Sequence, residues 1–215
     1  MKAAESVNII GGADGPTSIF LAGRSGKRPM KVRIRNWIYQ LRRRAIARRI
    51  RPNAHTLREV TAFMKKHYGA VELSTESREY QEQRKCLKGS LIIEHRPELL
   101  GSLRTIPRSR VYDEAFIRKL EERLERQRER IAQIPEDRFP MDFHIYRIRR
   151  GGGRMEIEID YQWDVFGISY SGDKKEMMKL KRMSRRLYIY YGVSKEDIAN
   201  RSKRYSSLLT VLASD

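Results

Sequence analysis

The sequence predicts an α+β protein that is mostly helical, with a small antiparallel β-hairpin or meander near residues 141–170. Two observations predict this class. Apolar residues recur at helical spacing through most of the 215 residues, and the spacing changes to an alternating one only between residues 141 and 170. A hydrophobic share of 40% is enough for a core, so we do not expect a chain that is disordered throughout.

The first 29 residues are expected to form a segment separate from the rest. Residues 7–10 and 17–22 favour two short strands, and the glycines and proline of residues 11–16 favour a turn between them. A basic linker follows at residues 23–29. Residues 30–215 are then expected to form one basic α+β domain.

Helical patterns fill most of that domain. The first expected helix spans residues 30–51 and is ended by Pro52, and the second starts at Asn53 or Thr56 and ends at Gly69. The third starts at Thr75 and breaks near Gly89 or before Pro97, and a loop is expected at 101–112. Three more helices are expected at 115–134, at 173–192 and, as a single last helix, from Ser194 to about Leu212. The helix at 115–134 favours packing within the domain over a free coiled coil. In the first helix one apolar face is expected to point inward: Ile34, Trp37, Ile38, Leu41 and Ala45.

A hairpin is expected where residues 141–149 and 154–163 alternate around three glycines, with a third strand at 166–170. Placing Arg150 opposite Arg154 brings His144 opposite Asp160, and a register shifted by two is also consistent. This His–carboxylate pair admits two interpretations, acid–base chemistry or a polar face of the sheet.

Positive charge is concentrated in one window. The net charge is +19, and residues 24–58 hold 13 basic residues and no acidic one. We expect the first helix and its end to bind a polyanion, RNA or DNA, because clustered arginines neutralise phosphates. The predicted binding residues are Arg33, Arg35, Arg42, Arg43, Arg44, Arg48, Arg49 and Arg51. An anionic membrane surface, an acidic protein partner or a plain solvated face would also fit the pattern.

Several classes of protein are excluded or not expected. Cys86 is the only cysteine, so no internal disulfide can form, and no apolar window approaches the length of a membrane span. The four histidines lack metal-ligand spacing, and no nucleotide-binding glycine motif is present. We therefore expect a cytoplasmic protein with no metal, no cofactor and no catalytic residue.

Residues 8–23 read NIIGGADGPTSIFLAG. This segment resembles the signature of the β subunit of sodium-translocating decarboxylases, a family of multi-span membrane proteins that decarboxylate carboxybiotin and export sodium. The resemblance implies that Asp14 handles the cation, with Gly11, Gly12, Gly15 and Pro16 shaping a broken backbone around it. It also implies an alternative function, as an accessory or β-subunit-like component of such a system. A tight turn between two strands is the other interpretation of the same residues.

Overall fold

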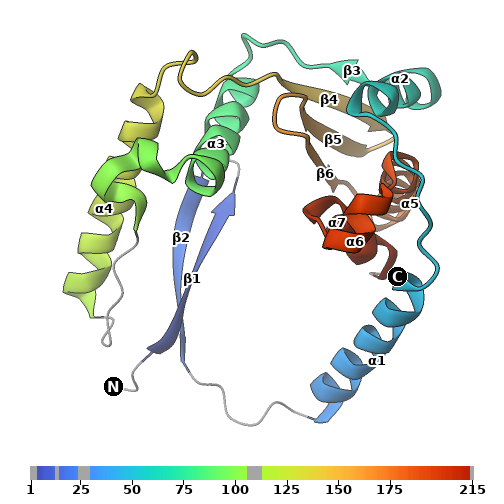
Figure 1. Ribbon diagram of the computed structural model, residues 1–215, viewed down its shortest axis with the longest axis horizontal. Helices are drawn as coiled ribbons and strands as arrows, with labels where there is room; N and C mark the ends of the chain where they lie inside the picture. Colours follow the sequence, from blue (N-terminus) through green and yellow to red (C-terminus); the bar gives the residue numbers. More distant parts are fainter. Residues whose placement is uncertain (1–3, 13–14, 24–29, 106–112, 214–215) are drawn as a thin grey trace. The chain divides into compact units, whose positions relative to one another are not determined.

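The chain consists of two compact units, each assembled from segments distant in sequence. The computed structural model describes residues 4–12, 15–23, 30–105 and 113–213, the first two ranges by their backbone alone (Figure 1). The first unit comprises Met1–Lys27 and Ser74–Met141, and the second comprises Arg28–Leu73 and Asp142–Asp215.

The first unit contains a β-hairpin and a group of helices. Strands β1 (Ala4–Gly12) and β2 (Gly15–Gly23) pair antiparallel. The helices are α3 (Arg78–His95), the 3-10 helix η1 (Pro97–Arg104) and α4 (Glu114–Gln133). Of the two predicted ends of the third helix, the structure has the later one, because α3 continues through Gly89 and ends before Pro97.

Two polar residues are buried among the helices of the first unit. The helical pattern of α4 has one polar position, Gln127, whose Nε2 donates to the carbonyl of Leu103 at 3.0 Å. The buried Lys88 donates from Nζ to the carbonyl of Ile134 at 2.6 Å. Each buried donor therefore has an acceptor, which removes most of the free-energy penalty of burying it.

The second unit is a helical layer on a four-stranded antiparallel sheet. Its sheet has the order β3-β4-β5-β6, and its elements are α1 (Met30–Ala47), α2 (Leu57–Tyr68), β3 (Val71–Glu72), β4 (Phe143–Arg150), β5 (Gly153–Asp160), β6 (Val165–Ser171), α5 (Lys174–Tyr191), α6 (Lys195–Asn200) and α7 (Lys203–Ala213). The predicted α+β class is confirmed. The two-residue strand β3 was not predicted, because it is too short to show alternation.

One face of the sheet carries the core of the second unit. Tyr146 and Ile148 of β4 and Ile157 of β5 pack with Leu180 of α5 and Val60 of α2 in one buried cluster. Both helices begin at side-chain caps: the α2 cap is a full capping box formed by residues 56 and 59, and the α5 cap is the carboxylate of residue 173. The sequence therefore specifies where each helix starts, and the buried cluster holds the helices on the sheet.

The predicted register of the hairpin is wrong by one residue. Arg150 pairs with Gly153, so the turn has two residues, not three, and Gly151 takes a φ of +55° there. Two-residue turns suit the twist of paired strands better than three-residue ones. As a result His144 lies opposite Ile159, and Asp160 lies opposite Phe143 on the other face of the sheet.

The last predicted helix is two helices. Arg201 adopts a left-handed conformation (φ 49°, ψ 47°) that ends α6. The hydroxyl of Ser202 donates to Asp197 Oδ1 at 2.6 Å and accepts from the amide of Tyr205 at 3.2 Å. Ser202 therefore stabilises the start of α7. The left-handed Arg201 and the capping Ser202 interrupt the helix, although the apolar pattern continues from α6 into α7.

A backbone junction fixes the segment that follows α1. The amide of Asn53 donates to the carbonyl of Val193 at 2.9 Å, and the amide of His55 donates to that of Tyr191 at 3.0 Å. Arg204 of α7 binds the same place: its Nε donates to the carbonyl of Gly192 at 2.8 Å and its Nη2 to that of His55 at 2.7 Å. The residues that follow α1 are thus held against the end of α5 by backbone hydrogen bonds and by Arg204.

Candidate polyanion interface

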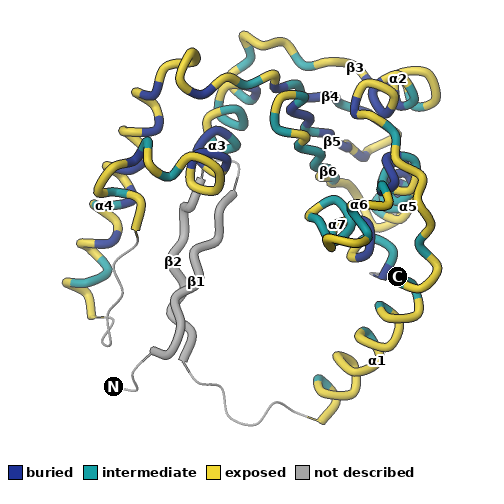
Figure 2. Tube along the Cα trace, in the orientation of Figure 1, coloured by how far each residue is buried: buried dark blue, intermediate teal, exposed yellow. Residues whose placement is uncertain are grey.

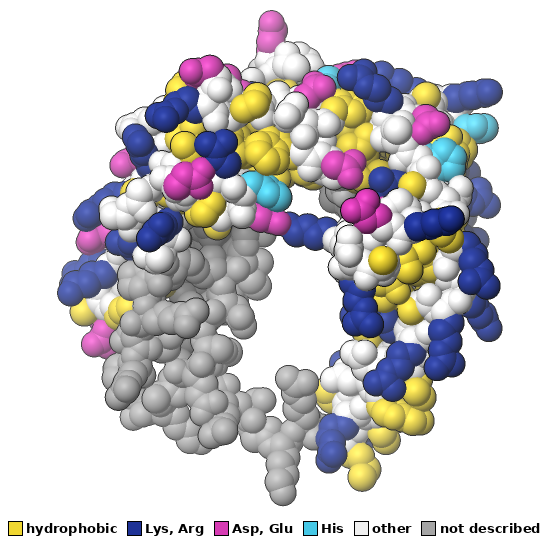
Figure 3. Space-filling view, in the orientation of Figure 1, with side chains coloured by type: hydrophobic (Ala, Val, Ile, Leu, Met, Phe, Trp, Pro, Cys, Tyr) yellow, Lys and Arg dark blue, Asp and Glu magenta, His cyan; other side chains and the backbone are white. Residues whose placement is uncertain are grey.

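Seven of the eight predicted arginines are exposed. Four lie on α1 and three directly after it: Arg33, Arg35, Arg42, Arg44, Arg48, Arg49 and Arg51. Arg43 is half-buried. None of the eight forms an ion pair with an acidic residue in the described part of the chain. Figure 3 shows Lys and Arg side chains along this helix, with hydrophobic atoms between them.

The apolar face of α1 points outward, contrary to the prediction. α1 has no buried residue, and Figure 2 shows it largely exposed. The exposed fractions are 51% for Ile34, 63% for Trp37, 53% for Ile38 and 42% for Leu41, and Ala45 is exposed too. Helical periodicity identifies an apolar stripe, but it does not show whether another element covers the stripe.

The opposite side of α1 is the half-buried one. Tyr39, Arg43 and Ile46 lie there, at spacings of four and three residues, and α1 packs mainly against α7. At 100° per residue the exposed apolar stripe lies between two cationic rows. One row contains Arg33 and Arg44, and the other contains Lys31, Arg35 and Arg42.

A second cationic surface lies on α5. Its exposed basic residues are Lys174, Lys175, Arg182 and Arg186, and the exposed Arg150 at the end of β4 lies beside Arg182 and Arg186. Lys179 is compensated, because its Nζ lies 2.7 Å from Glu176 Oε1. Lys181 and Arg185 are half-buried.

An aromatic row runs between α2 and α5. The rings of His55 and Tyr190 stack with centroids 4.1 Å apart, and those of Tyr190 and Phe63 stack at 4.2 Å. Phe63 also meets the edge of Tyr68 at 5.9 Å. These rings are half-buried, and they bring the junction at residue 55 into contact with the end of α2.

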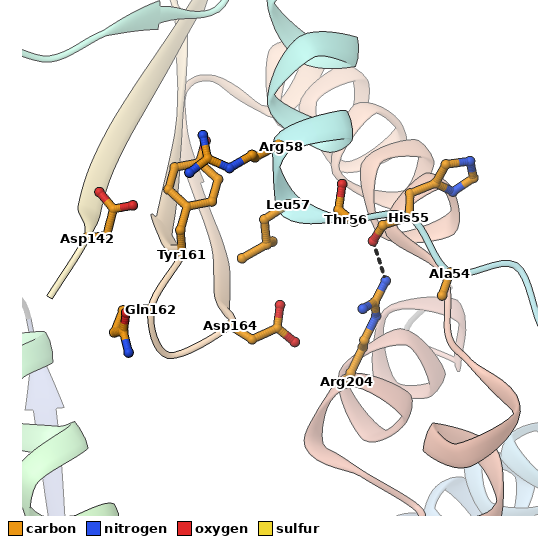
Figure 4. A pocket seen from close by; sticks show the side chains of 10 residues that line it. All are labelled: Ala54, His55, Thr56, Leu57, Arg58, Asp142, Tyr161, Gln162, Asp164 and Arg204. Carbon is orange, nitrogen blue, oxygen red and sulfur yellow. Dashed lines mark hydrogen bonds between the residues drawn. The ribbon is translucent and has the colours of Figure 1, made fainter.

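A cavity of about 550 Å³ opens beside the junction (Figure 4). Arg58 lies over the ring of Tyr161, 5.1 Å from its centroid, and Arg204 lies across the cavity. Asp142 and Asp164 also line it. Two arginines face two aspartates here, so this cavity does not extend the cationic surface.

Three tyrosine hydroxyls near this cavity form hydrogen bonds: those of Tyr161, Tyr146 and Tyr191. Tyr161 shares a hydrogen bond of 2.7 Å with Thr61, and its hydroxyl lies 3.5 Å from that of Tyr146. Burial raises the pKa of Tyr146 far above its ordinary value. Burial likewise raises the pKa of Tyr191, which donates to Asp164 Oδ1 at 3.0 Å.

The pair of His144 and Asp160 does not form. His144 Nδ1 lies 2.6 Å from Glu72 Oε1 on strand β3, and its Nε2 lies 3.0 Å from Asp142 Oδ1. Asp160 instead accepts the amides of Gln162 and Trp163, each at 2.9 Å. His144 thus connects β3 to the beginning of the hairpin. This contact could not be predicted, because strand β3 itself was not predicted.

Two carboxyl groups on the other sheet face are shifted toward their neutral forms. Burial raises the pKa of Asp160, which is fully buried, against the lowering effect of its amide partners. Burial and the neighbouring charge of Glu156 raise the pKa of Glu158. Glu156 itself pairs with Arg147, whose Nη2 lies 2.6 Å from Glu156 Oε1.

The decarboxylase-like segment is described only in part. The two predicted strands are present in the β1–β2 hairpin, but both are longer than predicted. Gly11 pairs with Pro16 and Gly12 with Gly15, so these four residues of the predicted turn belong to the strands. Asp14 lies outside the described residues. The ion-handling role that the resemblance implies therefore stays a prediction.

The fold and the site together define an α+β protein with an exposed cationic helix and a second cationic surface on α5. No family model matches the chain, and neither does any curated protein or solved structure. Among the described residues, no helix is both long and apolar enough to cross a membrane. In the same residues, no group of His, Cys, Asp and Glu is arranged to hold a metal ion.

Proposed function

We propose that α1 and the arginines directly after it bind the phosphate backbone of a nucleic acid. The observation that carries this proposal is the set of seven exposed arginines without an ion-pair partner among the described residues. Uncompensated surface cations repel one another, and a polyanion relieves that repulsion while releasing its own counterions.

Two further features support a nucleic acid. Arginine presents a planar fork that binds a phosphate at two points, and it is the dominant cation of this helix. Trp37, exposed between the cationic rows, offers a ring on which an unpaired base can stack. Backbone contacts of this kind are independent of sequence, so we expect affinity without strong sequence preference.

A salt titration tests the proposal. The triple variant Arg35→Gln, Arg42→Gln and Arg44→Gln removes three exposed charges and leaves the half-buried Arg43 in place. If each arginine neutralises one phosphate, the slope of log K against log salt should fall by about 2.7 for duplex DNA and by about 2.1 for a single strand.

A matched variant on the first unit controls for total charge. Arg118→Gln, Lys119→Gln and Arg126→Gln remove three exposed charges from α4, and we expect the wild-type slope to remain. An α1 variant that folds and binds labelled RNA with wild-type affinity and slope would refute the proposal.

A second candidate function, binding to an anionic membrane surface, is favoured by one specific observation. The apolar face of α1 is exposed between two cationic rows, and a helix of that pattern lies in the interface of an anionic bilayer. Self-association through this face is disfavoured, because it would bring two strongly cationic helices together.

One variant distinguishes the two functions. Ile34→Ser, Ile38→Ser and Leu41→Ser remove apolar area from α1 and keep every arginine. Loss of binding to phosphatidylserine vesicles with unchanged RNA affinity would identify a membrane-surface protein whose RNA binding is only electrostatic. Unchanged vesicle binding would exclude insertion of the apolar face.

A further inference from the structure

A small cationic pocket lies on the second unit, apart from α1. It has a volume of about 180 Å³. The residues that line it come from the ends of α2 and β4 and from the middle of α5: Tyr68, Arg150, Lys179, Arg182, Met183 and Arg186.

The fold explains why these side chains meet. Residues 179, 182 and 186 are three and four positions apart, so they share one face of α5. Gly153 lies against the same helix, since a Cβ added there would come within 2.9 Å of Leu180 Cδ1. This close approach holds the hairpin end on α5 and brings Arg150 to the pocket.

The charges of the pocket are not balanced. Lys179 is paired with Glu176 at 2.7 Å. Arg150, Arg182 and Arg186 form no ion pair with any acidic residue that the structure describes, and no lining residue is acidic. Three like charges around one cavity destabilise the free protein, and a bound anion would remove that repulsion.

We propose that this pocket binds a phosphate monoester. A monoester carries a charge of about −1.5 to −2 at neutral pH and has three terminal oxygens, so it can accept from all three arginines. A phosphodiester carries only one charge and two such oxygens. The half-buried Tyr68 and the buried Met183 complete the lining. The site shares no residue with α1, so it goes beyond the proposed function.

Calorimetry with adenosine 5′-monophosphate and with adenosine tests the proposal. We expect the monophosphate to bind at least about tenfold more tightly, the effect of one charge-assisted hydrogen bond or more. Binding should strengthen as pH rises through about 6, where the monoester acquires its second charge.

Single substitutions locate the binding in the pocket. Arg182→Gln and Arg186→Gln are exposed substitutions on α5, so the fold should persist, and each should lower the preference for the phosphorylated probe. Arg118→Gln on α4 is the matched control and should keep that preference. No preference in the wild type, or a preference of unchanged size in both α5 variants, would overturn the proposal.

Two comparisons identify the source of the monoester. One compares oligonucleotides of one sequence with a 5′-phosphate or a 5′-hydroxyl, and the other compares phosphatidic acid vesicles with phosphatidylcholine vesicles. If the 5′-phosphate strand binds more tightly and this preference depends on Arg182, the source is a strand end. If the phosphatidic acid vesicles bind more tightly and this preference depends on Arg182, the source is a lipid headgroup. If neither pair differs while the mononucleotide binds, the ligand is a small phosphorylated molecule.

The same comparisons separate this site from α1. In the α1 triple-Gln variant, overall affinity for oligonucleotides should fall, while the ratio between 5′-phosphate and 5′-hydroxyl strands should persist. If the α1 proposal is wrong, the triple-Gln variant will bind oligonucleotides with the overall affinity of the wild type. If the pocket proposal is wrong, 5′-phosphate and 5′-hydroxyl strands will bind equally well.

Discussion

Gly192, at the junction behind α1, should not tolerate any side chain. It has φ +60° and ψ −159°, a backbone conformation that is essentially restricted to glycine. A Cβ at this position would lie 1.7 Å from the carbonyl oxygen of Asn53 and 2.7 Å from its carbon. Those atoms must therefore separate by roughly 1.5 Å or more in Gly192→Ala.

The expected loss of unfolding free energy is the sum of two effects. The backbone conformation alone contributes about 1–3 kcal/mol. Separating the two segments also weakens the hydrogen bonds of Asn53 to Val193 and of His55 to Tyr191, at about 1 kcal/mol each. With the contacts of Arg204 included, we expect about 4–6 kcal/mol, a large part of the total stability of a domain.

Two other glycines make the reasoning quantitative. Gly69 has φ +62° but nothing within 4 Å of an added Cβ, so Gly69→Ala should lose only about 1–2 kcal/mol. Gly152 has neither a positive φ nor a close neighbour, so Gly152→Ala should change stability by less than about 0.5 kcal/mol. Urea unfolding followed by circular dichroism measures all three.

The order of the three losses is the critical result. If Gly192→Ala unfolds at the same urea concentration as Gly69→Ala, the close approach to Asn53 contributes nothing, and the junction is not what holds the segment after α1. Equal stability of Gly192→Ala and the wild type would refute both parts of the reasoning.

Three further predictions concern other parts of the chain. Arg204→Gln should lower the unfolding free energy by about 3 kcal/mol in urea titrations, because carbonyl groups of the junction lose a charged donor; an unchanged midpoint would contradict this. Burial and Glu156 raise the pKa of folded Glu158 above its unfolded value, so the folded state binds more protons and stability falls as pH rises from about 4.5. Glu158→Gln should therefore be more stable than the wild type at neutral pH, and parallel stability profiles from pH 4 to 8 would show that the shift is absent. If the decarboxylase-like segment handles sodium, added sodium should raise the melting temperature of the wild type relative to potassium but not that of Asp14→Ala; equal responses would leave the segment as a turn.

The sequence predicted which residues make α1 cationic, but it did not predict how basic residues from different elements come together in the pocket on α5. The run of basic residues from 24 to 58 identified the cationic helix directly, because charge is a property of composition. The pocket at Arg150, Arg182 and Arg186 could not be predicted, since it needs the hairpin end to lie on α5. The basic residues of α5 were visible in the sequence, but nothing in it placed Arg150 beside them.

The sequence by itself determined the elements whose signals lie within a few residues of one another. Asp173 was predicted to start α5 and Gly192 to end it, and both are confirmed. For α2 the sequence left Asn53 or Thr56 as the start, and the structure has the capping box of Thr56 with Glu59. Capping and helical periodicity act over one or two turns, so they can be recognised without knowledge of the rest of the fold.

Only the tertiary structure decided three things: the register of the hairpin, the break at Arg201, and which face of α1 is uncovered. Each depends on a choice between arrangements that satisfy local preferences almost equally well. A shift of one residue changes which side chains lie opposite one another, and the number of turn residues that sets this shift is not encoded in the alternation of either strand. An apolar stripe has the same periodicity whether or not a neighbour covers it. The choice is made by contacts between distant segments, such as Asn53 against Gly192, whose energies no local pattern encodes.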